Sequence, residues 1–130
     1  YSALGESDEK IIMALSIQMI MPGKPQIWYL DLFAGKNDHE AVQRAGESGH
    51  KEINRTNLST DQIAEGLKKD VVQKQLALIR MRNTHKAFSE GAEVTISGEE
   101  SSLEIRWEYD GAYAELHVNF EEGTYTIESN

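Results

Sequence analysis

Side chains that could bind a metal or exchange a proton gather in one polar segment of this 130-residue sequence. His39, Glu40, His50 and Glu52 lie there, between an apolar stretch and the tripeptide INR. Their spacing matches no compact metal-binding pattern such as HExxH. No Ser/His/Asp or Cys/His arrangement suited to nucleophilic catalysis can be argued from the sequence. We therefore interpret these four as solvated loop residues, and we predict no catalytic residue and no metal site.

Arg55 is the charged residue with the most informative surroundings. It lies between Ile53 and Leu58, just before Ser59, which can cap a helix. A guanidinium held at such a place can pair with a carboxylate and donate to a sugar hydroxyl. The alternative is an ordinary surface arginine. From the residues alone, the surface arginine is the simpler interpretation.

The isolated histidines and the large aromatic residues have simple structural interpretations. His85 follows a helical pattern and His117 falls in a strand pattern, so we expect a helix-end and a strand-face residue. Trp28, Tyr29 and Trp107 also fall in strand patterns, where core packing is the usual role. We assign no ligand to any of these five side chains.

The stretch IWYLDLFAGKND, residues 27–38, changes abruptly from apolar to polar. Such a change can mark a buried strand that delivers polar groups to a ligand. It can also mark a core strand followed by a surface loop, which is the commoner case. Gly35 lacks the GxxxxGK[ST] frame of a phosphate-binding loop, so we do not expect a nucleotide site.

Composition limits the class of protein. The net charge is −9, which disfavours nucleic acid and anionic membranes because phosphate groups require clustered Lys and Arg. The apolar stretch from Ile11 to Met21 is too short to cross a bilayer. Cysteine is absent, which excludes disulfides and thiolate zinc sites and fits a reducing cytoplasm. The opening residues YSALG read like the middle of a longer protein, so we expect a piece of one.

The first half of the sequence predicts helices and one buried strand. Ser7 can cap a helix over residues 8–21, which is apolar almost all round and therefore needs cover on more than one side. That helix also offers a surface for a homodimer. Residues 26–31 predict a buried strand, followed by a long polar segment with one short helix near DHEAVQRAG. Ser59 and Gln62 form a capping box for the next helix, and Asp70 begins another.

After Gly91 the hydrophobic period changes from helical to two. In SLEIRWEYD and AYAELHVNF apolar and polar residues alternate, and the pair Asp110-Gly111 between them is a strong hairpin signal. EVTISG and TYTIES predict flanking strands. We therefore predict an α+β chain with a four-stranded antiparallel β-meander, one face of which packs on helices. The expected inward faces are Leu103, Ile105, Trp107 and Tyr109 on one strand, and Ala114, Leu116, Val118 and Phe120 on the next.

Several of these pieces resemble one known family. YSALG, PGKPQIWYLDLFAGKND, the INR tripeptide before a capped helix, and VVQKQLALIRMRNTHKAF occur in the order found in sucrose phosphorylases and related glycoside phosphorylases. These enzymes belong to the α-amylase superfamily, glycoside hydrolase family 13. The resemblance extends from the first residues to about Phe88 and covers the C-terminal portion of the family. It implies that residues 1–88 are the last helix–strand–helix part of a (β/α)8 barrel and that residues 89–130 are its antiparallel C-terminal domain.

The family resemblance also implies a reaction. Such enzymes transfer a glucosyl group with retention, through an Asp nucleophile, a Glu acid and a second Asp that binds substrate. Phosphate then releases α-glucose 1-phosphate, so an α-glucoside and inorganic phosphate are the implied partners and no cofactor is implied. We expect the three carboxylates in segments that precede this chain, and no catalysis from the fragment itself.

The resemblance carries one binding role to this sequence. The arginine of INR resembles the group that pairs with an aspartate and holds the distal hydroxyls of glucose, and here it is Arg55. Asn37 and Asp38 are weaker candidates, which we expect to shape the rim of the site and support it.

Two departures from the family leave the substrate open. TNLS follows INR where aromatic residues are common, and HEAVQRAGESGHKE differs from the usual loop. Glucosylglycerate or another α-glucoside therefore fits as well as sucrose. The alternative to an enzyme fragment is a stand-alone carbohydrate-binding or interaction module built on the β-meander, with an exposed aromatic such as Tyr113 stacking on sugar.

Overall fold

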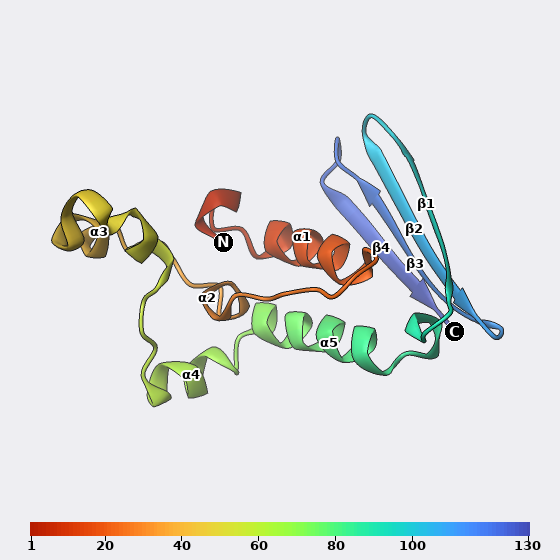
Figure 1. Cartoon of the computed structure of the whole chain (residues 1–130), viewed down its shortest axis with the longest axis horizontal. Helices are drawn as coiled ribbons and strands as arrows, with labels where there is room; N and C mark the ends of the chain where they lie inside the picture. Colours follow the sequence, from red (N-terminus) through yellow and green to blue (C-terminus); the bar gives the residue numbers. More distant parts are fainter. The chain divides into compact units, whose positions relative to one another are not determined.

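A computed structural model describes all residues from 1 to 130. The chain packs as two compact units, the first made of residues 1–11 and 26–75, the second of residues 12–25 and 76–130. Figure 1 labels the helices and strands. The elements in chain order are η1 (Ser2–Leu4), α1 (Asp8–Ile20), α2 (Tyr29–Leu32), α3 (His39–Ala45), η2 (Gly46–Asn54), α4 (Thr60–Gly66), α5 (Asp70–Thr84), η3 (Lys86–Phe88), β1 (Glu93–Glu99), β2 (Ser102–Tyr109), β3 (Ala112–Asn119) and β4 (Thr124–Ser129).

The predicted helix starts are confirmed by their caps. The backbone N–H of Lys10 donates to Ser7 Oγ at 3.3 Å in the first turn of α1. Ser59 and Gln62 make the full capping box of α4, because each side chain accepts from the backbone N–H of the other residue. α5 begins at Asp70, as predicted. No helix is both long enough and apolar enough to cross a membrane.

In the first unit, long-range contacts fix short helices that could not stand alone. Gln75 of α5 is 1% exposed, and its Nε2 donates to the main-chain oxygens of Leu32 at 2.9 Å and Asp31 at 3.2 Å. These bonds satisfy carbonyl groups in the four-residue helix α2. Gly66, at the end of α4, lies against the Phe33 ring so closely that an added Cβ would be 2.5 Å from it.

The strand expected over residues 26–31 is not formed. Trp28 has extended backbone angles (φ −79°, ψ 133°), but the residues around it pair with no neighbouring strand, and Tyr29 begins the helical turn α2. The apolar run predicted a strand because apolar runs of this length fill parallel sheets. A strand also requires a neighbouring strand to pair with, and no strand of this chain pairs with residues 26–28.

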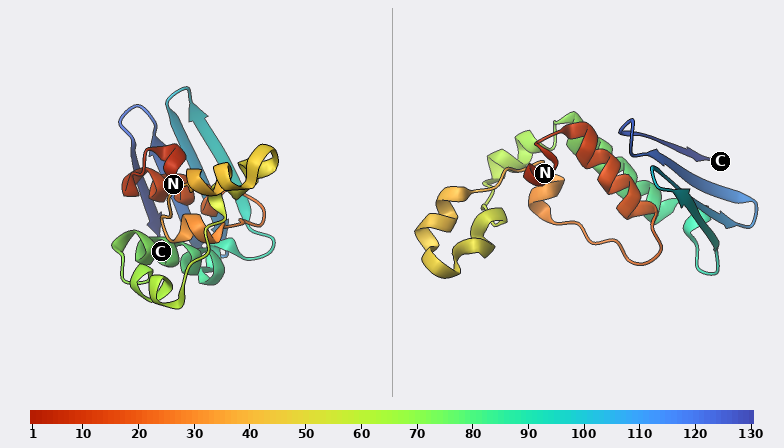
Figure 2. Two further views of the ribbon diagram at one scale, coloured as in Figure 1. Left: turned by 90° about the vertical axis from the view of Figure 1, so that its left-hand side faces the viewer. Right: turned by 90° about the horizontal axis from the view of Figure 1, so that it is seen from above.

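The second unit contains the predicted β-meander. Its four strands are antiparallel in the order β1-β2-β3-β4. The turn between β2 and β3 places both Asp110 (φ 44°) and Gly111 (φ 78°) in the left-handed region, which is the geometry of a type I′ hairpin. Figures 1 and 2 show the helical part of this unit on one side of the sheet.

One face of the sheet is the core of the second unit. The buried residues there are Ile105, Trp107, Ala114, Leu116 and Val118, and they pack with Ile20 and Ala87. Trp107 Nε1 donates to the main-chain oxygen of Ile20 at 2.6 Å, which ties the end of α1 to the sheet. Phe120 was expected on this face and is instead 48% exposed, because β3 ends at Asn119 and Phe120 enters the following turn.

Arg82 of α5 joins the helical segment and the sheet of the second unit. Its guanidinium carbon lies 4.6 Å from the ring centre of Phe88 and 4.5 Å from that of Trp107. The same group donates to the main-chain oxygen of Gly23 at 3.1 Å. Burial lowers the pKa of Arg82 from its usual value. A planar cation that contacts two rings and a carbonyl group therefore holds three segments together.

We predict that Arg82→Lys lowers the free energy of unfolding by about 1–2 kcal/mol, because an ammonium group cannot lie flat against both rings. The matched control is Arg80→Lys on the exposed side of the same helix, with an expected change below about 0.5 kcal/mol. Urea denaturation of the two variants measures the difference. Equal stability of both variants would contradict this role of Arg82.

Candidate functional site

Arg55 lies in the short connection between η2 and α4. Its side chain is 52% exposed, and its one ion pair within the chain joins Nη1 to Glu52 Oε1 at 3.3 Å. Glu52 is itself 43% exposed. A pair this open to water contributes little to stability. The guanidinium is therefore available for a stronger partner.

Two aromatic side chains hold the main chain on either side of Arg55. Trp28 Nε1 donates to the oxygen of Asn54 at 2.8 Å, and the Tyr29 hydroxyl donates to the oxygen of Thr56 at 2.9 Å. The two rings are 5.0 Å apart. The sequence predicted core packing for both, whereas Trp28 is 44% and Tyr29 37% exposed. No local sequence signal gives these hydrogen bonds, because each spans more than twenty residues.

Asp38 caps a helix beside this connection. Its Oδ1 accepts from the backbone N–H of Ala41 at 2.8 Å, which begins α3. Its own N–H donates to the oxygen of Ile53 at 2.7 Å, so Asp38 is also tied to the residue two before Arg55. The backbone N–H of Asn37 donates to Ser2 Oγ at 2.9 Å. The structure thus brings the segment that holds Asn37 and Asp38 to the one that leads into Arg55.

A hydroxyl next to Arg55 is unsatisfied. Thr56 Oγ1 is buried and makes no hydrogen bond within the chain. A buried hydroxyl without a partner is destabilising, and natural proteins usually supply one. Because this oxygen is enclosed by the chain, it is a local cost of the connection rather than a group open to a ligand.

His85 and His117 lie where their patterns predicted, whereas His39 and His50, interpreted as loop residues, lie in α3 and η2. His85 Nδ1 accepts from the backbone N–H of Ala87 at the start of η3, and His117 faces outward on β3, 3.1 Å from Glu104. No group of three or more His, Asp and Glu side chains is arranged to hold a metal ion.

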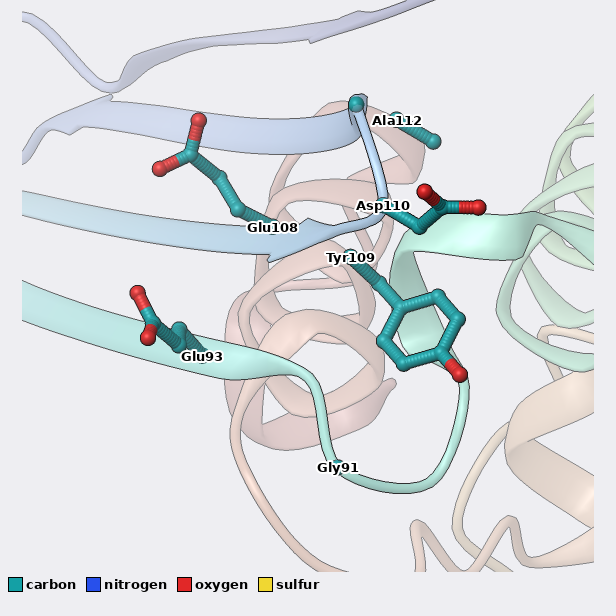
Figure 3. A pocket seen from close by; sticks show the side chains of 7 residues that line it. Gly91, Glu93, Glu108, Tyr109, Asp110 and Ala112 are labelled. Atoms are coloured by element: carbon teal, nitrogen blue, oxygen red, sulfur yellow. The ribbon is translucent and has the colours of Figure 1, made fainter.

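A shallow pocket lies at the end of the sheet where β2 turns into β3. Figure 3 shows Glu93 and Glu108 on neighbouring strands, with Tyr109 and Asp110 at the turn. The lining has three carboxylates and no cation. Hydrogen bonding lowers the pKa of two of them, Glu108 through Arg106 and Asp110 through Lys86. Because the lining groups themselves carry no cation, the pocket offers no charged partner for phosphate or a sugar phosphate.

The outer face of the sheet holds a cluster of charged residues rather than a free aromatic platform. The guanidinium carbon of Arg106 lies 4.4 Å from the ring centre of Tyr113. Arg106 also pairs with Glu108 at 2.7 Å and Glu115 at 2.9 Å. One side of the Tyr113 ring is thereby covered, which weakens the idea that this residue stacks on sugar.

Two known proteins with similar sequences are named as glycoside phosphorylases. A sucrose 6(F)-phosphate phosphorylase of Ilumatobacter coccineus is 47% identical over 127 residues, which cover 98% of this chain and 24% of the relative. A glucosylglycerol phosphorylase of Marinobacter adhaerens is 35% identical, over 92% of this chain and 24% of that protein. No family model matches the sequence.

The fold agrees with the same group. The crystal structure of sucrose 6F-phosphate phosphorylase from Thermoanaerobacter thermosaccharolyticum superposes with a TM-score of 0.89 and 38% identity. The match covers 99% of this chain and 26% of that one. The chain thus spans about a quarter of the length of the relatives it matches. Because sequence and fold agree along nearly all of its residues, the chain belongs to the sucrose phosphorylase-like glycoside phosphorylases, as a C-terminal part of such an enzyme.

Proposed function

We propose that the protein to which this chain belongs is a retaining α-glucosyl phosphorylase, which converts an α-glucoside and inorganic phosphate into α-glucose 1-phosphate. The observation that carries the proposal is the 47% identity, over 98% of the chain, to a relative named as a phosphorylase. In a double displacement, one carboxylate forms a glucosyl-enzyme and a second acts as acid and base. Both come from the rest of the protein, and this chain contributes binding groups.

Arg55 is the proposed substrate-binding residue. A guanidinium offers five N–H donors in a fixed plane, so it can pair with a carboxylate on one edge and donate to sugar hydroxyls on another. Its weak, exposed pair with Glu52 supports this role, because little is lost when Glu52 is exchanged for a desolvated partner.

The first candidate substrate is sucrose 6F-phosphate, after the name of the relative at 47% identity. Sucrose, glucosylglycerol and glucosylglycerate are the alternatives, because the loop HEAVQRAGESGHKE and the residues TNLS depart from the usual pattern of sucrose phosphorylases. These substrates share the glucosyl group that Arg55 would hold. They differ in the leaving group, so the acceptor side of the site selects among them.

The same proposal assigns a place in the whole protein to each of the two predicted domains of this chain. Residues 1–88 would close the barrel and residues 89–130 would form the C-terminal domain. Barrel segments from elsewhere in the protein would then lie beside residues 26–28, which belong to none of the paired strands of this chain. The enzyme would act in the cytoplasm.

A homodimer that forms through α1 would use the partly exposed apolar residues of this helix. Its residues Ile12, Leu15, Met19 and Ile20 are already buried within the chain.

We predict that the full-length protein, given an α-glucoside and inorganic phosphate, releases α-glucose 1-phosphate. A panel of sucrose, sucrose 6F-phosphate, glucosylglycerol and glucosylglycerate, each with and without phosphate, identifies the substrate. Proton NMR of the product gives the anomeric configuration, which retention requires to be α. Release of free glucose alone, or of the β-anomer, would contradict the proposed reaction.

We predict that Arg55→Ala in the full-length enzyme lowers kcat/KM about a hundredfold, or about 3 kcal/mol, because it leaves the partner carboxylate unpaired in a buried site. Arg80→Ala, an exposed arginine on α5, is the control and should leave kcat/KM unchanged. Steady-state phosphorolysis measures both. Near-normal turnover of Arg55→Ala would identify Arg55 as a surface residue only.

We predict that Asp38 acts through the α3 cap. Asp38→Ser keeps a capping oxygen and should keep kcat/KM within about twofold, whereas Asp38→Ala should destabilise the protein by about 1 kcal/mol. Asp61→Ala, in the first turn of α4, removes a carboxylate without removing a cap and serves as the control. Thermal unfolding and phosphorolysis report the two effects. If Asp38→Ser loses activity while its stability is unchanged, the carboxylate itself contacts substrate.

A further inference from the structure

Trp28 and Tyr29 each use the polar group of an aromatic side chain to bind the main chain next to Arg55. The indole N–H of Trp28 reaches the carbonyl group that precedes Arg55, and the hydroxyl of Tyr29 reaches the one that follows it, at 2.8 and 2.9 Å. The peptide group that precedes Arg55 and the one between Thr56 and Asn57 are therefore held by side chains from one distant segment. Neither carbonyl belongs to the interior of a helix or strand.

The backbone at Trp28 explains how two consecutive residues reach the same loop. In a continuous strand, neighbouring side chains point to opposite faces. Here Trp28 is extended and Tyr29 begins α2, so the chain turns between them. The turn places the rings 5.0 Å apart at an angle of 46°, with both polar ends on the Arg55 connection. The turn between Trp28 and Tyr29, where a strand was expected, thus allows both side chains to hydrogen-bond the Arg55 connection.

We propose that Trp28 and Tyr29 are positioning residues that fix the backbone of Arg55, and we call the pair the aromatic clasp. The proposal rests on the proposed substrate-binding role of Arg55. Arginine has a long, flexible side chain, and this one has only an exposed pair with Glu52 to orient it. A fixed backbone on both sides limits the conformations that must be lost when the guanidinium engages glucose. The clasp therefore acts before substrate binds and contributes no group to the reaction.

The test removes one hydrogen-bond donor at a time in the full-length enzyme. Trp28→Phe and Tyr29→Phe keep an aromatic ring and delete the indole N–H or the hydroxyl. Each variant should lower kcat/KM about tenfold, the effect of one lost hydrogen bond. Tyr125→Phe on β4 is the matched control for the tyrosine change, and its kcat/KM should equal that of the wild type. Thermal unfolding of each variant verifies that it is folded.

The coupling to Arg55 separates positioning from general stability. In an Arg55→Ala background, Trp28→Phe and Tyr29→Phe should cause no further loss, because the clasp acts only through the arginine. Hydrogen exchange of the peptide that spans residues 52–58 gives a readout independent of activity. It should be faster in both Phe variants and unchanged in Tyr125→Phe.

The outcomes distinguish the two proposals. If Arg55→Ala loses activity but the Phe variants keep wild-type kcat/KM and exchange rates, the clasp is wrong and the role of Arg55 stands. If the Phe variants lose the same factor with and without Arg55, the rings serve stability alone and the clasp is overturned. If Arg55→Ala is itself fully active, both proposals fail.

Discussion

The structure depends on side-chain donors that reach main-chain carbonyl groups in distant segments. Carbonyl groups at helix ends and in loops lack partners within regular secondary structure, and an unsatisfied buried one costs about 1–3 kcal/mol. In this chain, amide, indole, phenol and guanidinium groups supply those partners across tens of residues. The pairs are Trp28 to Asn54, Tyr29 to Thr56, Gln75 to Asp31 and Leu32, Arg82 to Gly23, and Trp107 to Ile20. Each unit is thereby held by a few directional contacts in addition to its apolar packing.

Local signals were sufficient to predict the helix starts and the sheet. The capping box at Ser59 and the pair Asp110-Gly111 act within four residues, so their geometry follows from the sequence alone. Alternation with period two likewise fixes which side of β2 and β3 is buried, because a one-residue slip would expose the whole apolar face. Phe120 departs from that pattern only because it lies beyond the end of its strand.

Features that depend on distant partners could not be predicted in this way. Residues 26–31 have the composition of a strand, but a strand is defined by neighbours that the local pattern does not contain. Gln75 is polar and no local signal marks it as buried, but its burial follows once the carbonyl groups of α2 are known to lie beside it. The candidate site also depends on distant partners that the local sequence does not reveal. The sequence singled out Arg55, whereas the rings that hold its backbone were assigned to the core.

For the proposed role of Arg55, the weakness of its present ion pair is a functional advantage. Two exposed charges at 3.3 Å contribute at most about 1 kcal/mol, since water screens them and both side chains lose freedom. The same guanidinium between a carboxylate and sugar hydroxyls, in a site closed to water, gains stronger charge-assisted hydrogen bonds. Glu52 can therefore orient Arg55 without competing seriously with substrate. A tighter, buried pair at this position would be costly to break, because it leaves a buried charge unpaired, and it would therefore oppose the exchange of partners that binding requires.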